Sequence, residues 1–188
     1  MSILEPQYLV GTGALLLLVS LAAAFWPARK GNFYHRRMRR QSSRALKLLQ
    51  DKAISRPGSI ITYLRKMNPH AVEEVVLDAA ENAGHKVKRN SAYTGDGGVD
   101  GEIFVDGQWH LVQTKRYQKT INPQHVSDFN LVCARRGQPG LFIHCGRTGD
   151  KSRQNKADHV RFISGNALVA LIGGRSLNQA QTEHRIAA

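Results

Sequence analysis

The chain has 188 residues, which is enough for one domain of ordinary size and an appendage. It carries 27 Lys and Arg against 14 Asp and Glu, and this formal net charge of +13 points to a polyanionic partner, either nucleic acid or an anionic membrane surface. The two cysteines, Cys133 and Cys145, have no framework spacing, so the sequence excludes a disulfide scaffold and favours buried free thiols in a reducing compartment.

The first predicted element is a membrane anchor. Residues 8–26, YLVGTGALLLLVSLAAAFW, contain no charge and approach the ~20 residues that a helix needs to cross a bilayer. A cleaved signal peptide is the alternative, but the preceding segment has no Lys or Arg and carries Glu5. Cations follow the span, so the positive-inside rule predicts a single-pass protein of the inner (cytoplasmic) membrane, with its N-terminus outside. We expect residues 1–28 to form this anchor, with the rest of the chain in the cytoplasm.

A basic segment follows the anchor. Residues 29–66 are predicted to form a juxtamembrane stalk, in which Leu46, Leu49 and Ile54 have helical spacing before Pro57 ends the pattern. One interpretation is a solvated helix held near the membrane by anionic lipids. The other is a helix that binds DNA phosphates. The sequence leaves both open.

A compact domain is predicted over residues 67–175. Asn68 is expected to cap a helix, AVEEVVLDAAENAG, whose apolar residues lie on one face and which ends at Gly84. The segment HKVKRN is predicted to be a strand. After a glycine-rich turn, EIFV and QWHLVQTKR are predicted to form a hairpin around Asp106-Gly107.

The second half of the domain alternates helices and strands. A helix capped by Asn122 is expected in NPQHVSDFNLVCARRG, followed by the apolar strand GLFIHCG, a polar helix or loop, the strand VRFI and the helix GNALVALIGG. His144 and Cys145 are neighbours on a predicted strand and point to opposite faces, so we expect no shared metal there. The order predicts an α/β fold, a mixed central β-sheet flanked by helices and preceded by one transmembrane helix. Residues 176–188 are expected to be a flexible tail.

Two polar residues interrupt the predicted strand QWHLVQTKR. Gln113 and Lys115 share a face with Leu111, and a buried amide and ammonium need partners. Asp100, at the start of the neighbouring hairpin strand, is the natural partner, while Asp96 is expected to be a turn residue. A carboxylate and an amide oxygen suit Mg²⁺, and a nearby ammonium can orient or deprotonate a water. The alternative is a structural ion pair that only holds the hairpin together.

A family resemblance joins these residues. The segment GDGGVDG, a short hairpin and VQTKRY together resemble the Mrr-type restriction endonuclease catalytic domain, a D…QxK variant of the PD-(D/E)xK nuclease superfamily. NPHAVEEVVLDAAENAGHKV is similar to the opening helix of that family, and VRFISGNALVALI is similar to its closing strand and helix. The resemblance covers about residues 67–175 and implies a restriction-endonuclease-like fold.

The resemblance also implies roles for individual residues. Asp100 would be the principal metal ligand, Gln113 would contribute its side-chain oxygen, and Lys115 would activate the attacking water. Glu73 would supply the second negative charge. The alternative is that Glu73 and Glu74 are only acids of the first helical turn, which is a stronger alternative for Glu74 than for Glu73. The implied cofactor is Mg²⁺, with Mn²⁺ as a substitute, and the implied reaction is hydrolysis of DNA phosphodiester bonds. Possible DNA contacts are Arg116, Lys119, Arg135 and Arg136.

Two functions remain open from the sequence. The first is a membrane-anchored, Mg²⁺-dependent DNA endonuclease of restriction or DNA-processing type, acting as a homodimer if both strands are cut. The second is a catalytically inactive, DNA-binding component of a membrane-associated DNA-transfer or defence apparatus. Family members usually carry a separate domain that recognises modified DNA, and we expect none in this chain. A purely structural membrane protein with a lipid-binding stalk is a third alternative.

Overall fold

The computed structural model describes residues 33–52, 56–90 and 98–179, and the chain forms two compact units, residues 1–37 and 38–188. The predicted span at residues 8–26 lies outside the described residues, as does most of the glycine-rich turn before Gly98. Within the described ranges, no helix has both the length and the apolar character needed to cross a bilayer.

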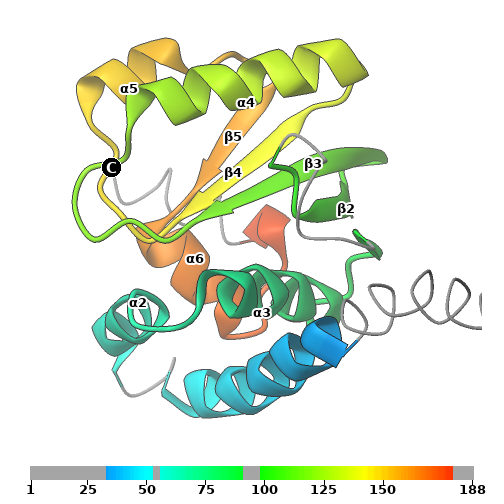
Figure 1. Ribbon diagram of the computed structural model, residues 1–188, viewed down its shortest axis with the longest axis vertical. Helices are drawn as coiled ribbons and strands as arrows, with labels where there is room; N and C mark the ends of the chain where they lie inside the picture. Colours follow the sequence, from blue (N-terminus) through cyan, green and yellow to red (C-terminus); the bar gives the residue numbers. More distant parts are fainter. Residues whose placement is uncertain (1–32, 53–55, 91–97, 180–188) are drawn as a thin grey trace, which may run out of the picture. The chain divides into compact units, whose positions relative to one another are not determined.

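The second unit contains a five-stranded mixed sheet in the order β1-β2-β3-β4-β5 (Figure 1). The first three strands pair antiparallel, and β3, β4 and β5 pair parallel. The strands are β1 (Val87–Arg89), β2 (Gly101–Val105), β3 (Gln108–Lys115), β4 (Gly140–His144) and β5 (Val160–Ile163). The helices are α2 (Pro57–Leu64), α3 (Pro69–Asn82), α4 (Pro123–Arg136), α5 (Asp150–Asn155) and α6 (Gly165–Ile172), and residues 33–52 are also helical. The predicted mixed α/β class is therefore confirmed.

Short-range signals set the ends of these elements. The side chain of Asn68 accepts a hydrogen bond from the backbone N–H of His70 at 3.0 Å, and a proline occupies the first turn of α3. Asn122 caps α4 in the same way, through the N–H of Gln124. Asp106 and Gly107 have φ angles of 50° and 81°, the positive pair that a type I′ hairpin turn requires.

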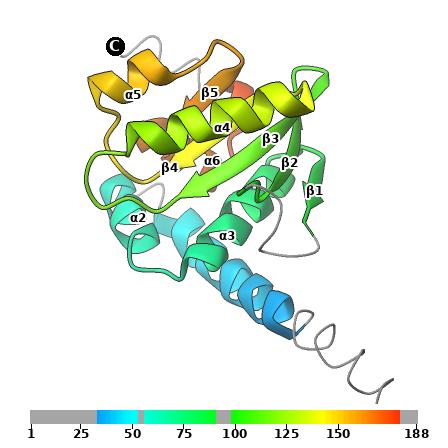
Figure 2. The same cartoon turned by 45° about the horizontal axis from the view of Figure 1, so that its top comes forward.

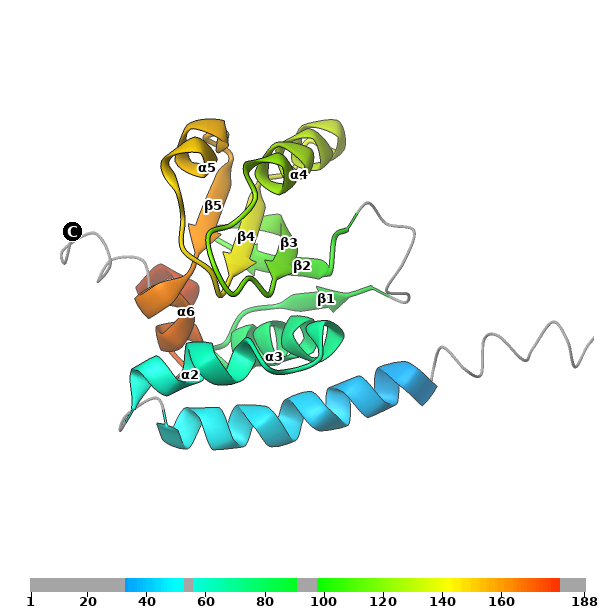
Figure 3. The same cartoon turned by 60° about the vertical axis from the view of Figure 1, so that its left-hand side comes forward.

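Helices cover both faces of the sheet (Figures 2 and 3). One face packs against α3 and α6 through a core that includes Val112 and Ile143, and the other packs against α4 through Leu111 and Phe142. Because side chains alternate along β3, Gln113 lies on the α4 side with Leu111. Both cysteines are free and buried, as predicted, and burial raises the pKa of each thiol to about 11.

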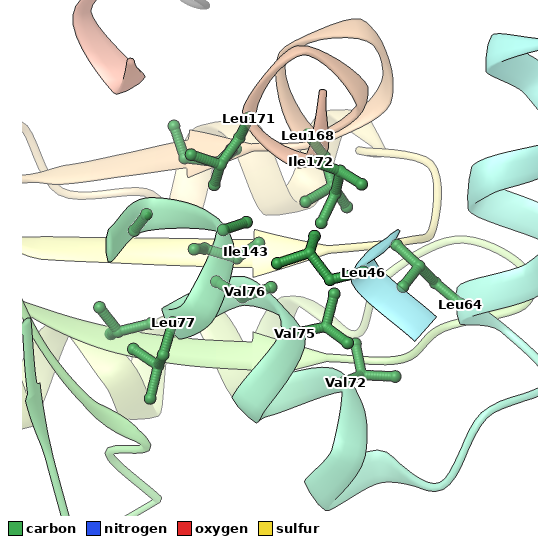
Figure 4. Packing of buried hydrophobic residues seen from close by; sticks show 14 of the residues in the cluster. Leu46, Leu64, Val72, Val75, Val76, Leu77, Ile143, Leu168, Leu171 and Ile172 are labelled. Carbon is green, nitrogen blue, oxygen red and sulfur yellow. The ribbon is translucent and has the colours of Figure 1, made fainter. Parts of the chain in front are cut away.

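The helix that ends at residue 52, in the segment predicted as a stalk, packs its apolar face into the domain. Its apolar side chains belong to the main core: Met38 and Leu46 are 3% exposed, and Leu49 is fully buried. Leu46 lies among side chains of α3 and α6 (Figure 4). The hydroxyl of Ser42 also donates to a carboxylate oxygen of Asp78 on α3 at 2.7 Å. The apolar face of this helix, which suggested a solvated or membrane-lying helix, is therefore buried in the hydrophobic core of the domain.

Candidate active site

The candidate site lies where the β2–β3 ladder ends. Gly101 pairs with Val112, and β3 then continues to Lys115 beyond the start of β2. Asp100 takes the next place: its N–H donates to the Val112 carbonyl at 2.8 Å, and its Oδ2 accepts from the Thr114 N–H at 2.5 Å. The carboxylate thus replaces the missing strand partner of Thr114, which fixes the position of Asp100 at the edge of the sheet.

The electrostatics of Asp100 are unusual for a surface-edge carboxyl. Burial, and after it the carboxylate of Glu73, raise the pKa of Asp100 to about 8, although the Thr114 hydrogen bond and the Lys115 ammonium act in the opposite direction. Glu73 comes from α3 on one face of the sheet, and Lys115 shares the other face with Gln113. The site therefore draws charged groups from both faces. Near neutral pH the Asp100 carboxyl needs a proton or a cation beside it.

Gln113 is 6% exposed and has a defined orientation. Its Nε2 donates to the Gly98 carbonyl oxygen at 2.7 Å, so its side-chain oxygen is the group that points away from that carbonyl. Gly98 has a φ of +79°, and a Cβ added there would lie 2.7 Å from Nε2 of Gln113. The glycine before Asp100 is therefore needed for two reasons, its backbone conformation and the close approach of the amide.

Substituting this glycine tests the arrangement. Gly98→Ala should lower stability by more than Gly84→Ala and should also weaken Mn²⁺ binding at the site. Both positions have positive φ, which costs alanine about 1 kcal/mol, but a Cβ at Gly84 meets nothing within 4 Å. Urea denaturation and Mn²⁺ titration of the two variants measure the difference. Equal losses in both variants would mean that the Gln113 contact contributes nothing.

The two neighbouring acids of α3 have different partners. Glu74, whose side chain is 5% exposed, forms an ion pair with Arg89 at 3.4 Å, and Arg89 also binds Asp78 at 2.7 Å. Glu73 instead faces the candidate site, with its Oε2 3.0 Å from Nδ1 of His70. Sequence analysis missed His70, although its spacing of three positions before Glu73 places both on one side of the helix.

Lys115 is held through its backbone. The N–H of Cys145 donates to the Lys115 carbonyl at 3.2 Å, and the Arg65 guanidinium donates to the Cys145 carbonyl from Nε at 3.0 Å and Nη2 at 2.6 Å. Arg116 closes the chain of contacts by donating to the Arg65 carbonyl at 2.8 Å. The end of α2 is thereby tied to the ends of β3 and β4. No local pattern in the sequence pointed to Arg65.

The predicted DNA contacts fall into two groups. Arg116 and Lys119 are exposed in the segment that follows β3, near Lys115. Arg135 and Arg136 are exposed at the last turn of α4, which carries the chain from the end of β3 back to the start of the parallel strand β4. The latter pair therefore lies at the opposite end of the sheet, and the structure does not bring it to the candidate site.

The residues present fit a hard divalent cation. The Glu73 carboxylate acts on the Asp100 carboxyl, and the amide of Gln113 is held against the Gly98 carbonyl, two residues before Asp100. Within the described ranges, no group of three His, Cys, Asp or Glu side chains is arranged to hold a metal. Mg²⁺ commonly keeps several waters and takes only one or two carboxylates from the protein, so a sparse set of oxygen donors suits it.

Comparison with known proteins gives a family match and a similar enzyme. The Mrr_cat family, described as restriction endonuclease, matches residues 64–172. The type IV methyl-directed restriction enzyme EcoKMrr of Escherichia coli (strain K12) is 28% identical over 150 residues, which cover 76% of this chain and 46% of that enzyme. The chain thus spans less than half the length of this relative. No solved structure gives a significant match.

Proposed function

The chain belongs to the Mrr_cat family of restriction endonucleases, and from this premise we propose that it is a Mg²⁺-dependent DNA endonuclease that hydrolyses phosphodiester bonds. The observation that carries the proposal is the half-buried Asp100 carboxyl, whose pKa is raised to about 8 by desolvation and by the carboxylate of Glu73. Such a pair of acids is costly in the absence of a cation, and perturbed groups of this kind gather at functional sites.

Each residue has a proposed task. Asp100, Glu73 and the side-chain oxygen of Gln113 would hold the ion, with Mn²⁺ able to replace Mg²⁺. When bound, the ion supplies Lewis acidity and lowers the pKa of a coordinated water. Lys115 would orient the attacking water and place positive charge beside the scissile phosphate. The Thr114 N–H keeps the Asp100 carboxylate in place, and the Gly98 carbonyl keeps the amide of Gln113 turned correctly.

The cellular setting is also a proposal. The E. coli relative is a methyl-directed restriction enzyme, so restriction of foreign DNA is the first role that we propose, and DNA processing is the second. The charge-free segment at residues 8–26 is proposed to anchor the protein in the inner membrane, with the catalytic domain in the cytoplasm. Anionic lipids would then lie near the basic segment that follows. A homodimer would supply the two sites that cleavage of both strands needs.

A plasmid assay tests the activity. The full chain, purified in a neutral detergent, is incubated with supercoiled plasmid in Mg²⁺, Mn²⁺ or EDTA, beside Lys115→Met. Nicking should require the metal and should fall by at least about a hundredfold in the variant, the range expected for loss of a proton-transfer or charge-stabilising group. Equal nicking by both proteins would identify a contaminant and remove the proposal. DNA binding without any cleavage would instead support the inactive, DNA-binding alternative.

A further inference from the structure

The helix that ends at residue 52 has two contrasting faces within the second unit. Its apolar face is buried in the core, as described above for Met38, Leu46 and Leu49. Its opposite face is exposed and rich in cations, which we call the basic stripe: Arg39, Arg40, Arg44 and Lys47. A helix docked in this way cannot turn, so the stripe is held toward solvent.

The stripe is regular along the helix. Arg40, Arg44 and Lys47 follow one another at intervals of four and three residues, which places them on one side with rises of ~6 Å and ~4.5 Å. Asp51 is the one acid between residues 38 and 52. Two flanking cations have other contacts, since Arg39 acts on the Glu81 carboxylate and Lys52 lies 6.0 Å from the ring centre of Tyr63. The three central cations therefore form the core of the stripe.

A membrane surface is the weaker candidate for this face. A helix that lies in a bilayer interface inserts its apolar side among the lipid chains, and here that side is used by the protein core. Only electrostatic attraction remains for the exposed face, apart from Leu48, which is 53% exposed. Closely spaced cations with a single exposed leucine beside them fit the duplex phosphate backbone, which carries about one charge per 1.7 Å of helix axis.

The rest of the domain has only a small excess of cations over acids. Residues 67–175 contain 14 Lys and Arg against 11 Asp and Glu, so the sheet and its later helices carry little net positive charge. A nuclease must hold a polyanion whose charge its own acidic site repels. The cations of the stripe supply that attraction from a rigid element of the same unit.

We infer that the basic stripe binds the phosphate backbone of duplex DNA, outside the candidate active site and without reading sequence. The inference rests on the proposed function in taking DNA as the substrate. It adds a distinct surface, because no residue of the stripe belongs to the proposed metal site. Binding of this kind is driven by release of counterions and weakens steeply with salt.

The test is a salt titration of binding in the absence of divalent metal. The full chain in neutral detergent with EDTA is titrated against a labelled duplex at several salt concentrations. For Arg40→Gln/Arg44→Gln/Lys47→Gln, the slope of log K against log salt should become shallower by about 2.7, from 0.9 per phosphate contact, with at least about tenfold weaker binding at low salt. The matched control Arg40→Lys/Arg44→Lys/Lys47→Arg keeps the charge and should keep the slope.

The outcomes separate this inference from the proposed activity. An unchanged slope in the neutralised variant would overturn the inference. So would loss of binding to phosphatidylserine vesicles with the DNA slope intact, because the stripe would then be a lipid surface. If the slope falls as expected while the unmodified chain fails to cut DNA in Mg²⁺, the stripe stands as a DNA-binding surface and the proposed endonuclease does not.

Discussion

Replacing Asp100 with asparagine is expected to stabilise the metal-free protein at pH 8.5 while lowering cleavage at least about a thousandfold. Asparagine has the same shape and can still accept the hydrogen bond from the Thr114 N–H, but it carries no charge. The cleavage loss follows from removal of the principal proposed ligand. The stability gain follows because a half-buried carboxylate beside Glu73 no longer has to be charged.

The stability that Asp100 contributes to the folded protein falls as the pH rises. The pKa of Asp100 is about 8 in the folded protein against an ordinary value of 3.8, so between these values the folded state binds more protons than the unfolded state. The contribution of Asp100 to stability is therefore most favourable below pH 4 and is lost as the pH rises toward 8. One pKa unit corresponds to about 1.4 kcal/mol. The free energy of unfolding of Asp100→Asn at pH 8.5 should therefore be higher than that of the unmodified protein by at least about 2 kcal/mol.

Thermal unfolding in EDTA at pH 5.5, 7.0 and 8.5 measures this effect, and repetition with Mg²⁺ measures the response to metal. Mg²⁺ should raise the melting temperature of the unmodified protein and leave Asp100→Asn unchanged. Asp128→Asn is the control, because Asp128 is exposed on α4 and should alter neither response. If Asp100→Asn melts lower than the unmodified protein at pH 8.5 in EDTA, the carboxyl is not held at an electrostatic cost.

Substituting two adjacent leucines of the helix that ends at residue 52 should have opposite effects on stability. Leu49→Asp is expected to cost more than about 4 kcal/mol and to prevent stable folding, because Leu49 is fully buried and an unpaired charge would take its place. Leu48→Asp should change stability by less than about 0.5 kcal/mol, because Leu48 is 53% exposed on the same helix. Urea denaturation of the two full-length variants measures the free energy of unfolding of each.

The same packing predicts that a fragment beginning at residue 60 will not fold stably, since it lacks Leu46 and Leu49. Circular dichroism of that fragment provides an independent check on the leucine pair. Similar stability for Leu49→Asp and Leu48→Asp, together with a folded fragment, would show that the helix is an appendage and not a part of the core.

Much of the fold was predictable because its signals are local. Asn68 and Asn122 cap their helices within two residues, and Asp106-Gly107 sets a turn between strands that follow directly. The place of the helix before Pro57 was not predictable in this way. Leu46 and Leu49 make an amphipathic pattern that suits either a lipid surface or a protein core, and the choice depends on apolar partners in α6, far along the chain.

Some features of the candidate site were also predictable from the sequence, and others were not. Neighbouring hairpin strands placed Asp100 close to Gln113 and Lys115 in the prediction, and in the structure the Lys115 ammonium acts on the Asp100 carboxyl. The catalytic roles stay a prediction. Three other features were not predictable: the hydrogen bond from Thr114 to Asp100, the orientation of the Gln113 amide and the Arg65 contacts. A hydrogen bond is lost when its two atoms move apart by a few tenths of an ångström, and local sequence patterns do not fix tertiary distances so closely.

The core shared by α6 and the helix that ends at residue 52 has a consequence for biosynthesis. Leu46 packs in one cluster with Leu168 and Ile172, so contacts of very long sequence separation complete the unit. During translation the early helix emerges well before its partner, and the cluster can close only when α6 has left the ribosome. A nascent chain that stalls before α6 is therefore expected to leave α3, the helix that carries Glu73, without its contacts to α6.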